Sequence, residues 1–147
     1  MGWGCCSAYG SGPIFKIQRV LDSKRYLKIL SNAVLPHAWE AFHTPWIFQQ
    51  GNDPKHVSKA VKEWLDENEI HLMSWSSQSP DLNLIEHLCE HLARSTAGLT
   101  ARNKAEKFEQ LRQKWEEIRP DVINKLLESM PRRCEAVIKA KGYATRY

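Results

Sequence analysis

The sequence predicts an α/β fold in which helices flank a mixed sheet, and three observations support this class. Two strand-like runs joined by a turn open the chain, short apolar runs recur at residues 46–50 and 70–75, and helical periodicity fills most of the remainder. The 147 residues, of which 42% are hydrophobic, suffice for one buried core. We therefore predict a single domain over residues 1–147.

The first twenty residues predict a β-hairpin. Strand-like runs at residues 3–9 and 14–20 surround the sequence GSGP at residues 10–13, a cluster that is typical of a turn. A helix is expected to follow, because Asp22 is a good N-cap and the next residues are apolar at helical spacing. Pro36 is expected to bend or split this helix.

The middle of the chain predicts two short strands with a helix between them. Residues 46–50, WIFQQ, are typical of a short buried strand. Asp53 is then expected to cap a helix that has Pro54 at its first position. Residues 70–75, IHLMSW, alternate in side-chain type and predict a further strand.

The second half of the chain is predicted to be helical. Ser79, followed by a proline, is expected to start one helix, and residues 96–103 interrupt the helical pattern. Residues 104–118 form a strongly amphipathic helix, and Pro120 begins a last helix that extends to about Lys141.

The charge and the cysteines restrict the partners and the compartment. The chain carries a net charge of +4, and residues 131–147 alone carry five basic residues against Glu135. Such a segment either meets phosphates or is a solvated helix end. No run approaches the ~20 apolar residues of a membrane helix, so we expect no membrane partner. The four cysteines form no CxxC pair, which favours a reducing intracellular compartment.

Two segments carry a specific resemblance to a known family. Residues 46–65, WIFQQGNDPKHVSKAVKEWL, and 75–88, WSSQSPDLNLIEHL, resemble the catalytic core of mariner-type (DDE superfamily) DNA transposases, whose pattern reads roughly QQDNDPKH and SPDLNPIENLW. Residues 1–17 and 126–142 are similar to the segments that flank this core. The resemblance implies a truncated ribonuclease H-like fold. It also implies that the chain is part of a catalytic domain and carries no helix-turn-helix DNA-binding domain.

The resemblance also implies a metal site, which this sequence does not complete. In the family, two aspartates and a glutamate hold two Mg²⁺ or Mn²⁺ ions for phosphodiester cleavage and strand transfer. The glutamate corresponds to Glu86, and the second aspartate falls on Gly51, with 34 residues between the two positions. The first aspartate would precede the strand that contains Trp3. Glu86 is therefore expected to be the one catalytic and metal-binding residue, in an incomplete site without bound cofactor.

The missing first strand affects how the sheet of the truncated fold is completed. The family's first strand is central and lies between the hairpin and residues 46–50, so its absence is expected to expose sheet edges. The hairpin then docks onto residues 46–50, or another chain fills the gap, either a second copy or a full-length transposase.

Asp53 offers a carboxylate near position 51, but its expected use is to cap the following helix.

We predict a degenerate transposase catalytic-domain fragment with weak, non-specific DNA binding and without strand cleavage. The alternatives are a metal-dependent enzyme completed by a partner and a protein-interaction module. The family implies the nucleus, and the cytoplasm is the other option. The residues expected to contact DNA are Lys55, His56, Lys59, Arg132, Arg133, Lys139 and Lys141.

A zinc site is a competing interpretation of one short stretch. Residues 87–91, HLCEH, match the H-x-x-E-H pattern of one class of zinc peptidases. The transposase resemblance already accounts for this helix, so it does not favour a metallopeptidase. Zinc binding by His87 and His91 remains as a separate option.

Overall fold

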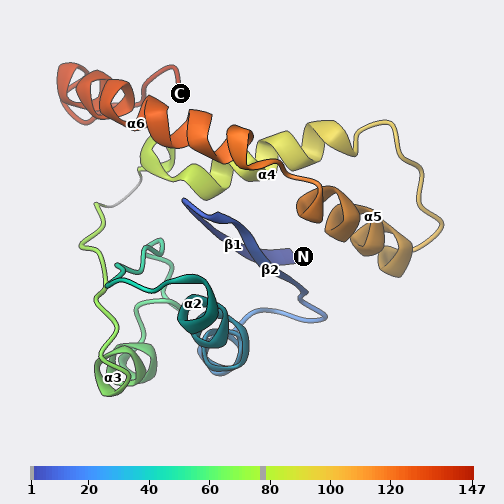
Figure 1. Cartoon of the computed structure of the whole chain (residues 1–147), viewed down its shortest axis with the longest axis horizontal. Coiled ribbons are helices and arrows are strands. Elements are labelled where there is room, and N and C mark those ends of the chain that lie inside the picture. The colour runs from blue at the N-terminus through green and yellow to red at the C-terminus, as the bar shows by residue number, and fades with distance from the viewer. Residues whose placement is uncertain (1, 77–78) are drawn as a thin grey trace. The chain divides into compact units, whose positions relative to one another are not determined.

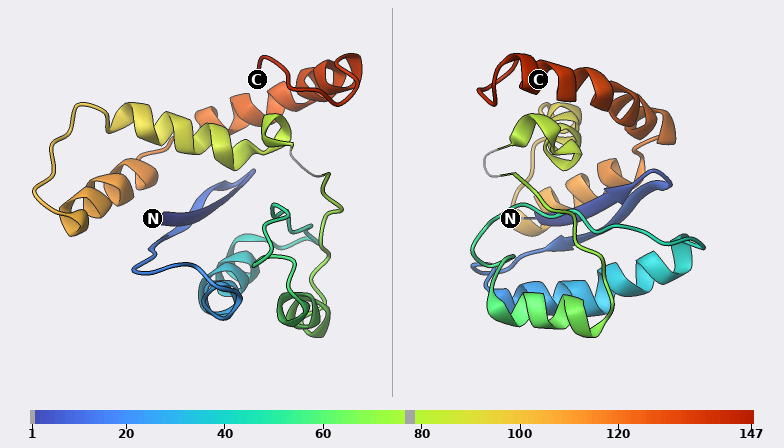
Figure 2. Two further views of the ribbon diagram at one scale, coloured as in Figure 1. Left: turned by 180° about the vertical axis from the view of Figure 1, so that it is seen from behind. Right: turned by 90° about the vertical axis from the view of Figure 1, so that its left-hand side faces the viewer.

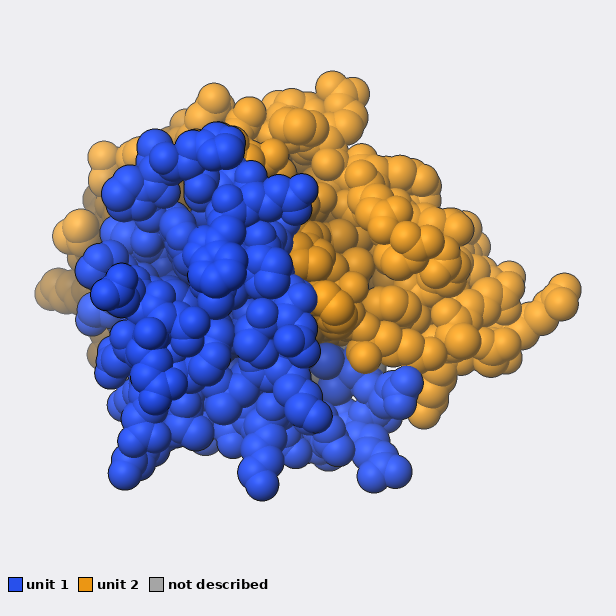
Figure 3. Space-filling model, turned by 60° about the horizontal axis from the view of Figure 1, so that its bottom comes forward, with its two compact units in different colours: residues 1, 17–78 blue, residues 2–16, 79–147 orange. Residues whose placement is uncertain are grey.

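The computed structural model describes residues 2–76 and 79–147. The chain divides into two compact units, which Figure 3 distinguishes by colour. Unit 1 contains Ile17–Gln78, and unit 2 contains Gly2–Lys16 and Ser79–Tyr147. Figure 1 labels the elements of both units, which combine strands and helices as the sequence predicts. The single-domain assignment stays a prediction.

The predicted hairpin is present, but its turn lies earlier than expected. β1 (Gly2–Ser7) pairs antiparallel with β2 (Gly10–Lys16), and Ser7 faces Gly10. Residues 8–9 therefore make the turn, and the GSGP cluster belongs to β2. The reason lies in Gly10, whose φ of 138° is in a region that favours glycine and lets the strand start directly after a two-residue turn.

An irregularity in the hairpin connects it to a helix of unit 2. The register shifts between the pair formed by Gly4 and Ile14 and the next pair towards the turn. Pro13 lies in this interval, and it has no N–H to contribute to a ladder. The carbonyl of Gly12 accepts a hydrogen bond of 2.7 Å from Nε1 of Trp115 in α5 (Lys104–Glu116). The bulge thus provides the acceptor that fixes α5 to the hairpin.

Unit 1 begins with a helical run over residues 23–41 that is not split at Pro36. α1 (Ser23–Ile29) is capped by Asp22, whose Oδ1 accepts the Arg25 N–H at 2.8 Å. A π-helical turn, η1 (Leu30–Val34), follows and leads into α2 (Leu35–Ala41). Pro36 lies just after the π-helical turn, and the backbone stays helical on both sides of it.

The two strands predicted in unit 1 are reduced to a single contact. The structure has one parallel bridge between Phe48 and Leu72. The Phe48 N–H donates to the His71 carbonyl at 2.7 Å, and the Met73 N–H donates to the Phe48 carbonyl at 2.8 Å. Ile47 is 63% exposed, so residues 46–50 are not enclosed on both faces as a buried parallel strand would be. The prediction of full strands here was wrong.

The helix predicted from Asp53 also begins later. α3 (Lys59–Glu67) starts after Ser58. Asp53 instead closes a turn, because its Oδ1 accepts the Lys55 N–H at 3.1 Å and its carbonyl accepts the His56 N–H at 2.8 Å. The core of unit 1 consists of apolar side chains from these helices, with Tyr26, Leu30, Val61 and Leu65 almost fully buried.

Unit 2 contains the second half of the chain. The helix expected from Ser79 is preceded by a 3₁₀ turn, and residues 96–103 separate two helices as predicted. α4 and α6 lie side by side in Figures 1 and 2. The elements of this half are η2 (Pro80–Leu82), α4 (Leu84–Ser95), α5 (Lys104–Glu116) and α6 (Pro120–Lys139). The core residues are Leu88, Leu92, Trp115, Ile118 and Ile123. Among the described residues, no helix is long and apolar enough to cross a membrane.

Candidate functional site

Gly51 stands at the corner where the sequence resemblance expects an aspartate. A Cβ built on Gly51 would meet no atom within 4 Å, so the position has room for a side chain. Gly51 is also not among the glycines with a positive φ, so an L-residue fits its backbone. The missing carboxylate is therefore a property of the sequence. The packing around position 51 does not require a glycine there.

The side chains around Gly51 hold the corner in place. The buried Gln50 accepts a 2.7 Å hydrogen bond from the Tyr26 hydroxyl through Oε1 and donates from Nε2 to the His56 carbonyl at 3.1 Å. Asn52 donates from Nδ2 to the Trp75 carbonyl at 2.9 Å. Each amide thus connects the corner to a segment distant in sequence, and the loop is ordered without a metal ligand at position 51.

His56 faces into unit 1. Its Nδ1–H donates to the Gly51 carbonyl at 3.2 Å, and its ring centroid lies 4.2 Å from that of Tyr26. Its Nε2 is buried and has no hydrogen-bond partner among the described residues. Burial is the main cause of the lowered pKa of His56, and its neighbours have smaller effects. A neutral, inward-facing imidazole has no N–H available for phosphate.

The charged residues after the corner pair with one another. Lys55 forms an ion pair with Asp53, and the hydrogen bond from its ammonium is the main cause that lowers the pKa of Asp53. The Asp53 carboxylate is thus committed to a lysine and to its own turn. Lys59 is exposed and lies 3.6 Å from Glu63, one helical turn further along α3. Surface pairs of this kind are weak, so Lys59 is available to a phosphate.

Glu86 belongs to unit 2 and lies in the first turn of α4, with its side chain exposed. Over residues 2–76 and 79–147, no three His, Cys, Asp or Glu side chains gather where they could hold a metal ion. A pair of divalent ions needs several oxygen ligands, and a single glutamate does not supply them. The residues present therefore do not fit the metal pair that the resemblance implies.

The histidines of the HLCEH stretch are not arranged as a zinc pair. Nε2 of His87 accepts a 2.6 Å hydrogen bond from Nη1 of Arg133 in α6, so this nitrogen is occupied. Arg133 is buried and also donates to the Asp81 carbonyl at 2.9 Å and to the Ser129 hydroxyl at 2.7 Å. Its guanidinium lies 4.7 Å from the ring centroid of Tyr147. Arg133 thus organises the interior of unit 2 and offers no surface to phosphate.

The remaining basic residues of the C-terminal segment are exposed. Arg132 and Lys139 lie on α6, and Lys141 follows its end. Arg146 is exposed as well, and its guanidinium lies 5.4 Å from the ring centroid of Tyr147. The structure therefore gathers four exposed cations in one short stretch of unit 2, which is a surface suited to polyanions.

Sequence reasoning did not anticipate the contact that positions this stretch. Oδ2 of Asp81 accepts hydrogen bonds from the Thr145 N–H at 2.8 Å and from the Thr145 hydroxyl at 2.7 Å. These bonds, the hydroxyl one first, lower the pKa of Asp81. Asp81 is part of the SPDLN block, so the sequence marks the residue, but no local pattern indicates a partner 64 residues away.

Comparison with known proteins identifies relatives that cover the whole chain. The chain is 47% identical over 147 residues to the transposable element Tc1 transposase of Caenorhabditis elegans and 46% identical to the Tcb2 transposase of Caenorhabditis briggsae. It spans 54% of the length of each of these relatives. No protein-family profile matches it.

Solved structures show the same fold. The Mos1 transposase catalytic domain with Raltegravir and Mg matches with a TM-score of 0.85 at 18% identity, over 99% of this chain and 76% of that one. The Mos1 mariner paired end complex with Mn matches with a TM-score of 0.84 at 18% identity, over 96% of this chain and 43% of that one. These matches confirm the predicted ribonuclease H-like fold, and the two Mos1 structures were solved with Mg and Mn.

Proposed function

The chain is a homologue of the Tc1/mariner-family transposases over its whole length, and we propose that it is a degenerate segment of their catalytic domain that retains weak DNA binding without strand cleavage. Gly51 carries this proposal. The corner is ordered and has room for a carboxylate, yet the sequence provides none. With Glu86 as the one matched acidic ligand, the chain lacks the oxygen donors that paired Mg²⁺ or Mn²⁺ ions require.

The proposed DNA contact is the exposed basic segment of unit 2. Arg132, Lys139 and Lys141 are exposed, whereas Arg133 is buried and is left out of the proposed surface. In unit 1, Lys59 is retained as a secondary phosphate contact, and the inward-facing His56 is left out. Contacts to phosphates alone give binding that does not depend on sequence and weakens steeply with salt.

The proposal extends to partners and compartment. Residues 46–50 and 70–75 are joined by one bridge, so their backbones offer further pairing positions to a second copy or to a full-length transposase. The protein would encounter DNA in the nucleus, and we propose the nucleus as its compartment. A partner that supplies the missing aspartates would restore the enzymatic alternative.

A plasmid-nicking assay tests the proposed lack of catalysis. Supercoiled DNA is incubated with the full chain and Mn²⁺, beside the Gly51→Asp and Gly51→Asp/Glu86→Gln variants. We expect no nicking above background from any of the three. A carboxylate at position 51 and Glu86 together supply two of the three acidic ligands that the resemblance implies, so the ligand set stays incomplete.

The double variant is the control for contaminating nucleases, since it removes the matched glutamate. Nicking by the unmodified chain that disappears in a Glu86→Gln variant would overturn the proposal. Glu86-dependent nicking by Gly51→Asp alone would show that the site needs only one further carboxylate.

A further inference from the structure

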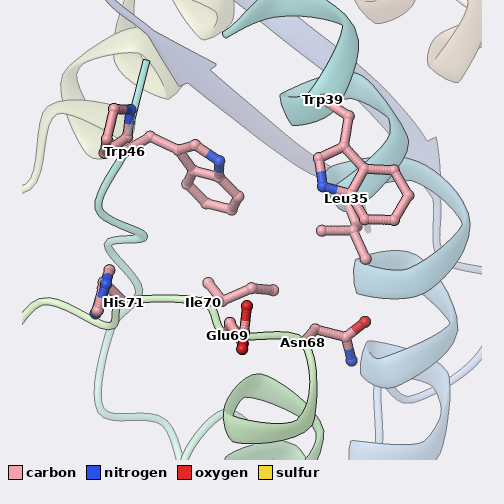
Figure 4. Close-up of a pocket in the computed structure, with 8 residues that line it drawn as sticks. Leu35, Trp39, Trp46, Asn68, Glu69, Ile70 and His71 are labelled. Atoms are coloured by element: carbon pink, nitrogen blue, oxygen red, sulfur yellow. The ribbon is translucent and has the colours of Figure 1, made fainter. Parts of the chain in front are cut away.

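Unit 1 contains a pocket of about 280 Å³ that the proposed DNA binding does not use. Its lining combines two indoles, Trp39 from α2 and Trp46 from the segment that follows, with the carboxylate of Glu69 and the apolar side chains of Leu35 and Ile70. Figure 4 shows the two tryptophans on two sides of the pocket, with Glu69 and Ile70 between them. The pocket therefore presents aromatic rings and a negative charge to one space.

The two tryptophans are positioned in different ways, and neither belongs to the buried core of unit 1. Trp46 is fixed by aromatic neighbours, because its ring lies 5.8 Å from Phe42 and 6.3 Å from Phe48 between centroids. Trp39 is 67% exposed, so its large apolar surface contributes little to folding. The face of an indole attracts cations, and two such rings around one space favour a positively charged ligand.

Glu69 occupies a position that folding alone would assign to glycine. It follows the end of α3 with a φ of 54°, in the left-handed region where glycine or asparagine is favoured. A carboxylate at a helix C-terminus is also unfavourable, and Asp66 and Glu67 add like charges beside it. No cation among the described residues forms an ion pair with Glu69. A strained residue that keeps its charge and lines a pocket indicates binding.

We propose that this pocket binds a lysine side chain of a partner polypeptide. The ammonium group lies between Trp39 and Trp46 and meets Glu69, and the alkyl stem packs on Leu35 and Ile70. The charge complementarity excludes DNA here, because the carboxylates repel phosphates.

An adjoining hollow indicates what flanks the lysine. It shares Pro45, Trp46 and His71 with the pocket, and it is lined further by apolar residues. Leu72 and Met73 in this lining are 40% and 38% exposed. Exposed apolar side chains beside a cation site favour a peptide in which apolar residues neighbour the lysine. This inference does not rest on the proposed DNA binding, because the pocket lining belongs to unit 1 and the basic segment belongs to unit 2. The lining shares Trp46 and residues 70–73 with the proposed pairing positions, but the lysine contact uses side chains and the pairing uses backbone groups.

Peptide binding to the full chain tests the proposal. The probe is a fluorescently labelled hexapeptide with one lysine flanked by leucines, titrated by fluorescence anisotropy beside the same peptide with glutamine in place of lysine. Trp39→Ala and Glu69→Gly are each expected to weaken binding of the lysine peptide about tenfold. Glu69→Gly is expected to raise the melting temperature, which separates lost binding from lost folding. Glu67→Gln, which removes a neighbouring charge outside the pocket lining, is the matched control and is expected to bind as the unmodified chain does.

Three results would overturn the proposal. The glutamine peptide binds as tightly as the lysine peptide, or Glu69→Gly retains full affinity, or the lysine peptide shows no binding at millimolar concentration. Trp39-dependent binding of a single-stranded oligonucleotide in place of the peptide would assign the tryptophans to base stacking and overturn it as well.

Discussion

Gly51, which carries the proposed lack of catalysis, has no structural role in the fold around it. The corner around it is maintained by Gln50, Asn52 and His56, and none of these contacts depends on a side chain at position 51. Neither a glycine nor a carboxylate at position 51 is therefore required by the fold.

The Gly51→Asp variant should accordingly be as stable as the unmodified chain. The built Cβ meets no atom within 4 Å and the backbone is not left-handed, so we expect the free energy of unfolding to change by less than about 0.5 kcal/mol. Urea denaturation followed by circular dichroism measures this. A loss of several kcal/mol would mean that the corner excludes a carboxylate, and the nicking assay with this variant would lose its meaning.

His56 makes the stability of unit 1 depend on pH. Burial lowers its pKa, so the unfolded chain takes up a proton near its ordinary pKa of about 6.5 while the folded chain remains neutral. The stability that the neutral His56 contributes is fully present above pH ~6.5, and it is lost as the pH falls through the lower pKa of the folded state. We expect the melting temperature to fall less between pH 7.5 and 5 in His56→Gln than in the unmodified chain. Equal slopes would show that this histidine titrates alike in both states.

At the scale of elements, the sequence predicted helix interiors better than element boundaries. The cap at Asp22 follows from local chemistry, and the structure confirms it, whereas the helical run continues through Pro36 with a π-helical turn before it. Asp53 failed as a cap because it has the same local chemistry in a turn, where its carboxylate accepts the Lys55 N–H. A short polar side chain can cap a helix or close a turn, and the packing of the following residues decides between the two roles. No local sequence pattern indicates that packing.

The short strands were overpredicted for a related reason. Residues 46–50 have strand-like composition, but a parallel strand is stable only between partners, and the structure gives Phe48 a single bridge. The candidate site follows the same division. The motif resemblance located Gly51 and Glu86, whereas the burial of Arg133 and the pocket at Glu69 depend on residues brought together from distant parts of the chain.

The C-terminal segment after α6 should be held less firmly to η2 when one hydroxyl is removed. Thr145 donates both its N–H and its hydroxyl to Oδ2 of Asp81, and the hydroxyl bond is the largest cause of the lowered pKa of Asp81. Thr145→Val keeps the shape and removes the hydroxyl donor. We expect the pKa of Asp81 to rise towards its ordinary value and the amide protons of residues 145–147 to exchange faster, both measurable by NMR.

Ser95 provides the matched control for that variant. Its hydroxyl donates to the Leu92 carbonyl at 2.9 Å within α4 of the same unit, and this bond involves neither Asp81 nor Arg133. Ser95→Ala should therefore leave the pKa of Asp81 unchanged. An unchanged pKa in Thr145→Val would contradict the assigned cause.

At the scale of the whole molecule, charge is the property from which residual function is expected. The net charge of +4 is matched by the segment from residue 131 to the C-terminus, where five basic residues oppose one acidic residue. The structure divides these cations by access: Arg133 is buried, and the others are exposed. Composition predicted the charge of this surface, but only the fold identifies which cations can meet a phosphate.

Neutralising the exposed cations should therefore abolish most of the DNA affinity. The triple variant Arg132→Gln, Lys139→Gln, Lys141→Gln leaves Arg133 and its interior contacts intact. Each lost phosphate contact reduces the slope of log K against log salt by about 0.9 for duplex DNA, so we expect a slope smaller by about 2 to 3. Anisotropy titrations with a labelled duplex of about 20 base pairs between about 50 and 200 mM salt measure this.

A second triple variant separates this surface from net charge alone. Arg94, Lys104 and Lys125 are exposed cations of unit 2 outside the C-terminal segment, and changing them to Gln lowers the net charge by the same amount. If binding were a response to overall charge, both triple variants would lose affinity and slope equally. Because contacts between a protein and phosphate act within a Debye length of about 10 Å, we expect only the C-terminal triple to lose both. Equal losses would remove the C-terminal segment as the site of DNA binding.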